Sequence, residues 1–169
     1  MIGDPVGGRD LVEFNLAQVN VARMRAEARS PVVGEFIAAL DPVNRLADQS
    51  AGFVWRLPAA EGHVLTHGPG GARDVVNLSV WSSYEDLHAF VYRSAHGRFV
   101  LKRSRWFEKV QQPSTALWWL PAGERPTVED ALARLDYLRR WGPSPKAFTL
   151  RRRYDANGRP AGVRRPNRG

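Results

Sequence analysis

The sequence predicts an α+β fold in which helices cover an antiparallel sheet. Two patterns support this prediction. Apolar and polar residues alternate over short segments, which is typical of strands, while other segments repeat apolar residues every three or four positions, as amphipathic helices do. The length sets the domain count, because 169 residues with 43% hydrophobic content can build one sizeable core. We therefore expect a single domain over residues 11–154.

The first expected strand covers residues 12–21 (VEFNLAQVNV). Its alternation assigns two faces, with Ala17, Val19 and Val21 on one and Leu16, Gln18 and Asn20 on the other. A helical pattern then begins at Pro31 and is interrupted at Asp41-Pro42. Proline lacks the amide hydrogen and disfavours helix before it, so we expect one bent helix or two through Leu46.

Residues 52–57 (GFVWRL) are rich in strand formers, and the Gly- and Pro-rich segment 58–73 is typical of a long hairpin loop. The strand that follows, from Val75, has two different faces. Val76, Leu78 and Val80 lie on one, and Asn77, Ser79 and Trp81 on the other. A strand with one aliphatic and one polar face separates two environments.

A helix follows this strand directly. Ser82 is its expected N-cap, with Glu85 completing a capping box. Two stripes run along the helix: Leu87, Phe90 and Val91 are apolar, while His88, Tyr92 and His96 form a neighbouring, more polar edge. We expect a small-molecule pocket where the strand and this helix meet.

Past Gly97 the helical pattern is expected to continue to about Val110. Residues 116–120 (ALWWL) predict another strand, and Thr127 is expected to cap a third helix that ends at Gly142-Pro143. Residues 147–153 are a candidate for a last strand. The order β-α-β-β-α-β with an added C-terminal helix is the ferredoxin-like pattern. Its helices cover one face of the sheet, so the other face is expected to be buried in a homodimer.

The net charge of +8 is concentrated at the C-terminus, since residues 151–169 carry seven arginines and one aspartate. We expect residues 155–169 to be a basic disordered tail and residues 1–10 a flexible leader. The nearly neutral body argues against nucleic-acid binding, except for non-specific contacts of the tail. The absence of cysteine excludes thiolate chemistry, and no signal or membrane-spanning pattern occurs, so a cytoplasmic protein is expected.

Several stretches together resemble a bacterial domain family of unknown function. They are LAQVNVAR (16–23), LDPVNRLADQSAGFVWRL (40–57), VNLSVWSSYEDLHAFVYRSAH (76–96), RSRWF (103–107) and LWWLPAGERPT (117–127). The family belongs to the dimeric α/β-barrel superfamily, with antibiotic-biosynthesis monooxygenases and haem-degrading oxygenases. The resemblance implies a two-chain barrel and a pocket between sheet and helices in each subunit.

In the haem-degrading members of that superfamily, the pocket uses an Asn on the first strand and a His on the second helix, with a Trp nearby. Asn20, His96 and Trp81 occupy comparable elements here, although His88 competes with His96 for the second role. The resemblance therefore leaves open a haem site with His96 as the axial ligand.

The candidate catalytic residues are His96, Tyr92 and Asn20. The candidate substrate-binding residues are Trp81, Asn77, Arg56, Arg103, Trp106 and His88. Burial would prepare His96 or Tyr92 for proton transfer, and Asn20 or Asn77 would polarise a carbonyl or hold an oxyanion. Each of these residues also has a purely structural interpretation, such as a core aromatic, a strand-end hydrogen bond or a surface ion pair.

Three functions remain open. The first is a monooxygenase-like enzyme that modifies a small molecule and requires no cofactor; the second is a haem-dependent version. The third is a non-catalytic ligand-binding dimer whose basic tail contacts an acidic partner. A zinc site at His63 and His67 is disfavoured, because glycine and proline surround them and no third ligand adjoins them.

Overall fold

The computed structural model describes residues 12–26, 30–58, 73–93 and 103–162. Its centre is a four-stranded sheet in the order β2-β3-β1-β4, in which all neighbours are antiparallel. The strands are β1 (Phe14–Arg23), β2 (Phe53–Arg56), β3 (Asp74–Trp81) and β4 (Thr115–Pro121). This is the strand order of a ferredoxin-like sheet, so the predicted α+β fold of ferredoxin-like type is confirmed.

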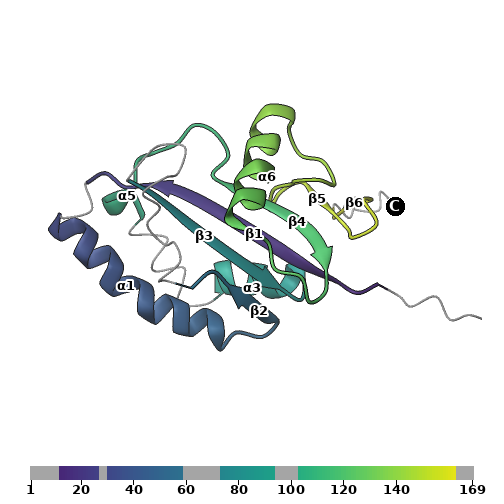
Figure 1. The fold of residues 1–169 in the computed structure, drawn as a ribbon, viewed down its shortest axis with the longest axis horizontal. Helices are drawn as coiled ribbons and strands as arrows, with labels where there is room; N and C mark the ends of the chain where they lie inside the picture. Colours follow the sequence, from purple (N-terminus) through teal and green to yellow (C-terminus); the bar gives the residue numbers. More distant parts are fainter. Residues whose placement is uncertain (1–11, 27–29, 59–72, 94–102, 163–169) are drawn as a thin grey trace, which may run out of the picture.

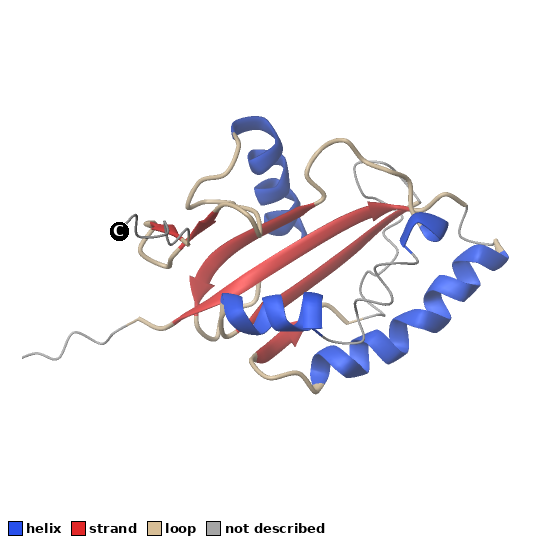
Figure 2. Cartoon of the chain, turned by 180° about the vertical axis from the view of Figure 1, so that it is seen from behind, coloured by secondary structure: helices blue, strands red, loops and turns tan. Residues whose placement is uncertain are grey.

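Helices lie on both faces of the sheet. They are α1 (Pro31–Asp48), α3 (Tyr84–Arg93), α5 (Arg103–Trp106) and α6 (Val128–Trp141). Figures 1 and 2, seen from opposite sides, show α6 in front of the sheet in one view and α3 in front of it in the other. Among the described residues, no helix is both long and apolar enough to cross a membrane.

The alternation in the two central strands is confirmed. Ala17 and Val19 of β1 and Val76 and Leu78 of β3 form one core with α6, and all four are at most 1% exposed. The expectation that this face is bare is wrong, because α6 supplies Ala131, Leu135 and Leu138 to cover it. The aliphatic face is therefore already buried within one chain.

The first helix is continuous. Pro42 lies inside α1, which runs without a break from Pro31 to Asp48. Its buried residues Phe36 and Ala47 pack on the face of the sheet opposite α6, through two further apolar clusters. The helix therefore runs along the polar face of β1 and β3 rather than over their aliphatic face.

Helix α3 begins one residue later than predicted. The Ser83 hydroxyl accepts a hydrogen bond from the Asp86 amide at 3.1 Å and donates one to the Asp86 carboxylate at 2.6 Å. Ser82 instead donates to the Gly52 carbonyl, at 2.9 Å. The N-cap of α3 is therefore Ser83, in the pattern S-x-x-D at 83–86, and not Ser82 in the pattern S-x-x-E at 82–85. Ser82 cannot cap the helix because its hydroxyl is bonded to the turn at Gly52.

The predicted continuation of helix to Val110 is also wrong in part. Residues 94–102 lie outside the described residues, α5 ends at Trp106, and Phe107 forms an isolated antiparallel bridge with Met24. The third helix agrees with the prediction, since the Thr127 hydroxyl accepts from the Asp130 amide at 3.1 Å. Gly142, at φ +78°, ends it.

After α6 the chain passes from one face of the sheet to the other. Phe148 makes a two-way backbone bridge with Leu117 at the free edge of β4, where a longer strand was expected. Ala147 belongs to the core under α6, whereas Phe148 packs with Trp81 on the opposite side. This alternation carries residues 149–154 to the face that holds α3.

Residues 155–162 are not disordered, contrary to the sequence prediction. Strands β5 (Arg153–Tyr154) and β6 (Pro160–Ala161) pair as a small hairpin. The Asp155 carboxylate holds the turn by accepting from the amides of Asn157 and Arg159, at 3.0 and 2.8 Å. The ordered domain thus extends to at least residue 162, and residues 1–11 and 163–169 lie outside the described residues.

Candidate functional site

A cavity of about 310 Å³ lies between the polar face of the sheet and helices α1 and α3. The sheet forms its floor, the two helices form its roof, and Phe107 and Leu150 contribute from either side. The walls are mainly apolar. This is the position at which the sequence predicted a small-molecule pocket.

The floor contains two rows of polar side chains that run across the strands. In the first row, Thr115 pairs with Asn20 and Asn20 pairs with Asn77. In the second row, Gln18 pairs with Ser79 and Ser79 pairs with Arg56. All six residues line the cavity. Residues two apart on a strand lie about 7 Å apart on one face, so the rows form a polar band across the floor.

Apolar residues flank this band at both ends. Trp81, paired with Phe53, lies beyond the second row, and Ala22, paired with Val75, lies beyond the first. Phe53 meets Trp81 edge to face, with ring centroids 5.4 Å apart. The floor is therefore polar in the middle and apolar at its ends.

A bulge in the edge strand β2 brings Arg56 to this floor. Residues three apart on a regular strand point to opposite faces. Here the register shifts between Phe53 and Trp55, so Phe53 and Arg56 both line the cavity while Val54 is exposed. Trp55 joins the core on the other face.

Asn20 has a fixed orientation. Its amide nitrogen donates to the Thr115 hydroxyl at 2.7 Å and to the Ser114 carbonyl at 3.3 Å. A backbone carbonyl only accepts, so the side-chain oxygen of Asn20 is the atom left for the cavity. Both N–H groups of Asn20 are already used, so this side chain offers the cavity an acceptor, whereas Asn20 or Asn77 was expected from the sequence to polarise a carbonyl or hold an oxyanion.

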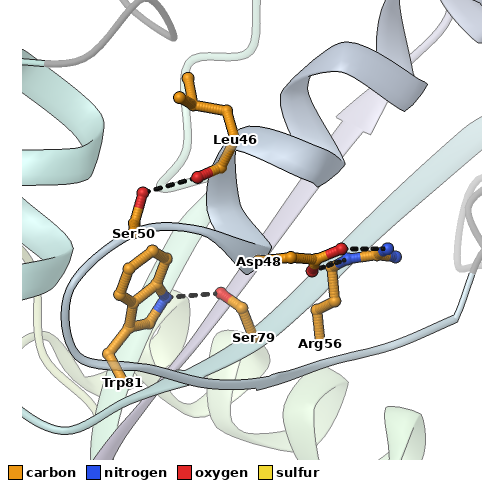
Figure 3. A network of polar contacts seen from close by, with 6 residues as sticks. All are labelled: Leu46, Asp48, Ser50, Arg56, Ser79 and Trp81. Atoms are coloured by element: carbon orange, nitrogen blue, oxygen red, sulfur yellow. Dashed lines mark hydrogen bonds and ion pairs between the residues drawn. The ribbon is translucent and has the colours of Figure 1, made fainter.

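Trp81 is almost fully buried and orients its neighbours (Figure 3). Its indole N–H donates to the Ser79 hydroxyl at 3.0 Å, and that hydroxyl donates to the side-chain oxygen of Gln18 at 3.1 Å. The chain of bonds occupies the Gln18 oxygen and leaves its NH2 group for the cavity. Trp81 thus serves both as a wall and as the start of a polar chain.

Arg56 is held by an acidic partner at the end of α1. Figure 3 shows the two-pronged contact, in which Nε of Arg56 lies 2.8 Å from one Asp48 carboxylate oxygen and its terminal nitrogen 3.1 Å from the other. Ser50 donates to the Leu46 carbonyl at 2.7 Å beside it and closes the helix end. The charge that Arg56 brings to the cavity is therefore largely balanced.

The roof is mainly apolar. Phe36, Leu40 and Val43 of α1 face Phe90 and Val91 of α3 across the cavity. Asn44, one residue after Val43, also lines the cavity, is only 6% exposed and makes no hydrogen bond with any described residue. A buried amide normally has a partner, so Asn44 is available to a group inside the cavity.

Three other candidates are placed by the structure. Tyr92 lies at the cavity edge with 60% of its surface exposed. His88 is absent from the described lining and stacks between Tyr84 and Tyr92, with ring centroids 5.7 and 4.6 Å away. Trp106 packs beside Phe36 in a separate apolar cluster, so the structure does not support a substrate-binding role for it.

The remaining candidates cannot be placed. His96, His63 and His67 lie outside the described residues, as does the side chain of Arg103. Within residues 12–26, 30–58, 73–93 and 103–162, no three histidines or carboxylates lie close enough together to hold a metal ion.

A second, more open groove of about 380 Å³ lies on the outer side of α3, lined by Tyr84, His88, Arg151 and Arg153 among others. The Tyr84 hydroxyl donates to the Leu150 carbonyl at 3.0 Å, and the Arg153 guanidinium lies over its ring at 4.0 Å. Burial raises the pKa of Tyr84, and the positive charge of Arg153 opposes that shift. These contacts attach the C-terminal segment to α3.

Gln18, Asn44 and Thr115 are among the cavity residues that sequence reasoning missed. The alternation placed Gln18 on the same strand face as Asn20, which is correct. It did not show that this glutamine faces a cavity rather than solvent. Asn44 lies one turn after Leu40, a spacing that could have placed it on the apolar face of α1. Thr115 could not be found from local pattern, since its place beside Asn20 depends on the pairing of β1 with β4.

A family described as "Domain of unknown function (DUF3291)" matches residues 15–163. No curated protein matches the chain. Among solved structures, SnoaB, a cofactor-independent oxygenase from Streptomyces nogalater, has a TM-score of 0.44 and 13% identity, covering 68% of this chain and 96% of that one. The NE2512 protein of unknown function from Nitrosomonas europaea has a TM-score of 0.44 and 12% identity, covering 68% and 97%.

Proposed function

The chain belongs to the DUF3291 family of unknown function, and we propose that it binds a small, mainly apolar molecule in the cavity between its sheet and helices α1 and α3. The observation that carries the proposal is the cavity floor, where six polar side chains from four strands form a band between apolar ends. Ordinary core packing does not explain such a band, because polar atoms that are half-buried without a hydrogen bond to a described residue, such as those of the Asn77 amide, are costly in an apolar core.

We propose further that this binding serves an enzyme, with monooxygenase-like modification of the bound molecule as its leading activity. The reaction class comes from the resemblance of the sequence to its superfamily. Tyr92 at the cavity edge and His96 are the proposed acid-base groups, and Asn77, whose amide makes no hydrogen bond with a described residue, is the proposed polariser of a carbonyl. A non-catalytic binding protein with the same cavity is the alternative.

The haem-dependent version has less support from the described residues. A haem requires an axial ligand and cations near its propionates. None of the described lining residues is a histidine, and the one arginine among them, Arg56, is paired with Asp48. A haem in this cavity would need His96 as its axial ligand, and His96 lies outside the described residues.

The predicted homodimer, paired as an α/β barrel, also remains a proposal. Because α6 covers the aliphatic sheet face, the partner would have to contact α6 or the exposed edge of β2 rather than a bare sheet. Sedimentation equilibrium at micromolar concentration should give twice the mass of 19.0 kDa. A monomer at that concentration would exclude the barrel.

The cavity proposal is tested by filling the cavity. Val43 lines it and is half-buried on α1, whereas Ala38 on the same helix is exposed. Val43→Trp should abolish the binding of tetralin, measured by calorimetry, and Ala38→Trp should leave it unchanged. Unfolding temperatures show whether either variant is folded. Equal binding by both folded variants, or no binding of apolar bicyclic compounds by the wild type, would refute the proposal.

Oxygen uptake in the presence of such compounds separates the enzyme from the binding protein. His96→Ala should reduce uptake far more than stability, while His88→Ala, which alters a residue outside the described cavity lining, should not. A titration with haemin addresses the cofactor. An absorption band that appears in the wild type and is lost in His96→Ala would replace the leading activity with the haem-dependent one.

A further inference from the structure

The polar band has a defined hydrogen-bonding polarity, because the surrounding bonds decide which atom each side chain presents. Asn20 presents its oxygen, since its nitrogen donates to Ser114 and Thr115. Gln18 presents its NH2 group, since its oxygen accepts from Ser79. The floor therefore offers an acceptor and a donor about 7 Å apart along β1.

Thr115 adds a second donor beside Asn20. Its hydroxyl oxygen accepts from Asn20 at 2.7 Å, and its own proton is used in no hydrogen bond with the described residues. Since a hydroxyl can accept and donate at once, that proton is available to a group in the cavity. The acceptor of Asn20 thus has one donor beside it across the sheet, on Thr115, and another along β1, on Gln18.

The roof complements this floor. Asn44, 6% exposed and without a hydrogen-bond partner among the described residues, lines the cavity from α1. A carboxamide can rotate to donate or accept, so Asn44 can meet either kind of group, while Asn20 and Gln18 on the floor cannot change roles without breaking their own bonds.

Charge is nearly absent from this lining. No carboxylate of the described chain lines the cavity, and its one cation, Arg56, makes a two-pronged contact with Asp48. Transfer of an ionised group from water into a mainly apolar cavity is unfavourable unless the cavity contains an unpaired opposite charge. The lining therefore favours a neutral ligand.

We infer that the cavity selects an uncharged, mainly apolar ring compound that carries a carbonyl-type acceptor for Gln18 and a hydroxyl-type donor for Asn20. This rests on the proposed function and adds the ligand class and three binding residues, Gln18, Thr115 and Asn44. The ligand's apolar ends would lie against Trp81 and Val75, at the two ends of the band.

Five bicyclic probes of similar shape test the inference by calorimetry: tetralin, α-tetralone, tetrahydronaphthol, hydroxytetralone and tetrahydronaphthoate. Hydroxytetralone should bind tightest, the ketone and the alcohol should each exceed tetralin by about fivefold, the contribution of one hydrogen bond, and the anion should bind worse than the alcohol.

Two variants assign the groups. Gln18→Met keeps the length of the side chain and removes its amide, so the ketone should lose its advantage over tetralin while the alcohol keeps its own. In Asn20→Leu the alcohol should lose its advantage over tetralin, while the ketone keeps its own. Gln112→Leu, at an exposed position outside the described lining, is the control and should change no ratio. If Asn20→Leu does not fold, the order of probe affinities in the wild type and the effect of Gln18→Met still test the inference.

The outcomes separate the two proposals. If tetralin binds but all four neutral probes bind equally well, or if the anion binds best, the inferred ligand class is wrong and the apolar cavity stands. If none of the probes binds, the proposed function fails and the inference with it.

Discussion

Asn20 lies directly opposite Asn77 in the pairing of β1 with β3, and both side chains line the same cavity. The two strands are the central pair of the sheet, so this relationship puts two amides in the middle of the molecule. Antiparallel partners share a face, which is why a polar residue on β1 meets a polar residue on β3. The opposite face of the same strands carries the aliphatic residues that pack under α6, namely Ala17, Val19, Val21, Val76, Leu78 and Val80.

The cap of α3 provides the first prediction. Ser83→Ala removes the side chain that accepts from the Asp86 amide, so it should lower the free energy of unfolding by about 1 kcal/mol. Ser82→Ala, the control next to it, removes only an exposed bond to the Gly52 carbonyl and should cost less than half of that. Urea denaturation measures both. If Ser82→Ala lowers the free energy of unfolding more than Ser83→Ala does, Ser82 is the N-cap, as the sequence predicted.

Gly52 and Gly123 form a matched pair for the second prediction. Both have positive φ, +70° and +88°. A Cβ at Gly52 would collide with the Asp86 side chain, whereas a Cβ at Gly123 would meet nothing within 4 Å. Both alanine variants incur the backbone cost of about 1 kcal/mol, and Gly52→Ala should lose at least about 1 kcal/mol more. Equal losses in urea denaturation would show that the Asp86 contact is readily relieved.

The third prediction concerns alkaline pH. Burial raises the pKa of Tyr84 above the ordinary value of 10.0, against the opposing charge of Arg153. Because the folded protein holds this proton more tightly than the unfolded chain, the contribution to stability is complete below pH 10 and is lost as pH rises through the raised pKa. Tyr84→Phe should therefore reduce the fall in unfolding free energy above pH 10.

At neutral pH the same variant should be less stable by about 1 kcal/mol, because it loses the bond to the Leu150 carbonyl. Tyr92→Phe is the control for this loss at neutral pH, since Tyr92 is mostly exposed. Guanidinium denaturation between pH 8 and 11 gives both profiles. Parallel profiles for wild type and Tyr84→Phe would contradict the prediction.

The sequence predicted the strand faces well, because alternation in β1 and β3 reflects two real environments. Val76 and Leu78 are buried under α6, and Asn77 lies on the cavity floor, as their pattern indicated. The covering of the aliphatic face by α6 was not predictable in the same way. A helix pattern shows which of its own sides is apolar, but not which face of a sheet it will cover.

The site was harder to predict than the fold. Asn20, Asn77, Trp81, Tyr92 and Arg56 do line one cavity, as their grouping in the sequence analysis required. The orientation of the Asn20 amide could not be predicted, because it depends on Ser114 and Thr115, about 95 residues away in the chain. Hydrogen-bond partners at that separation follow from strand pairing, which no local pattern encodes.

The fourth prediction concerns the C-terminus. A chain ending at residue 162 should unfold within about one degree of the full chain, because Val163 is the only large apolar residue beyond it. A chain ending at Tyr154 should unfold a few degrees lower, since it loses the β5-β6 pairing and the turn held by Asp155. Calorimetry measures both chains. Equal unfolding temperatures would show that the hairpin contributes nothing to the domain.

The last prediction concerns Arg56, the one charged side chain among the described residues that line the cavity. Asp48→Asn keeps the shape of the side chain but removes the charge that balances Arg56. Arg56 would then present an uncompensated cation to the cavity, so tetrahydronaphthoate should bind about fivefold to tenfold more tightly, while tetralin should bind as before. The free energy of unfolding should fall by less than about 1 kcal/mol, because both side chains are partly exposed and the pair is screened by solvent.

Asp136→Asn is the control for this variant, since Asp136 pairs with Arg139 on α6, away from the cavity. It should change neither affinity. The gain in Asp48→Asn should shrink as salt is added, because an exposed cation is screened and a neutral contact is not. If Asp48→Asn binds the anion no better than the wild type does, Arg56 does not reach the ligand, and the selectivity for neutral compounds must come from the apolar walls alone.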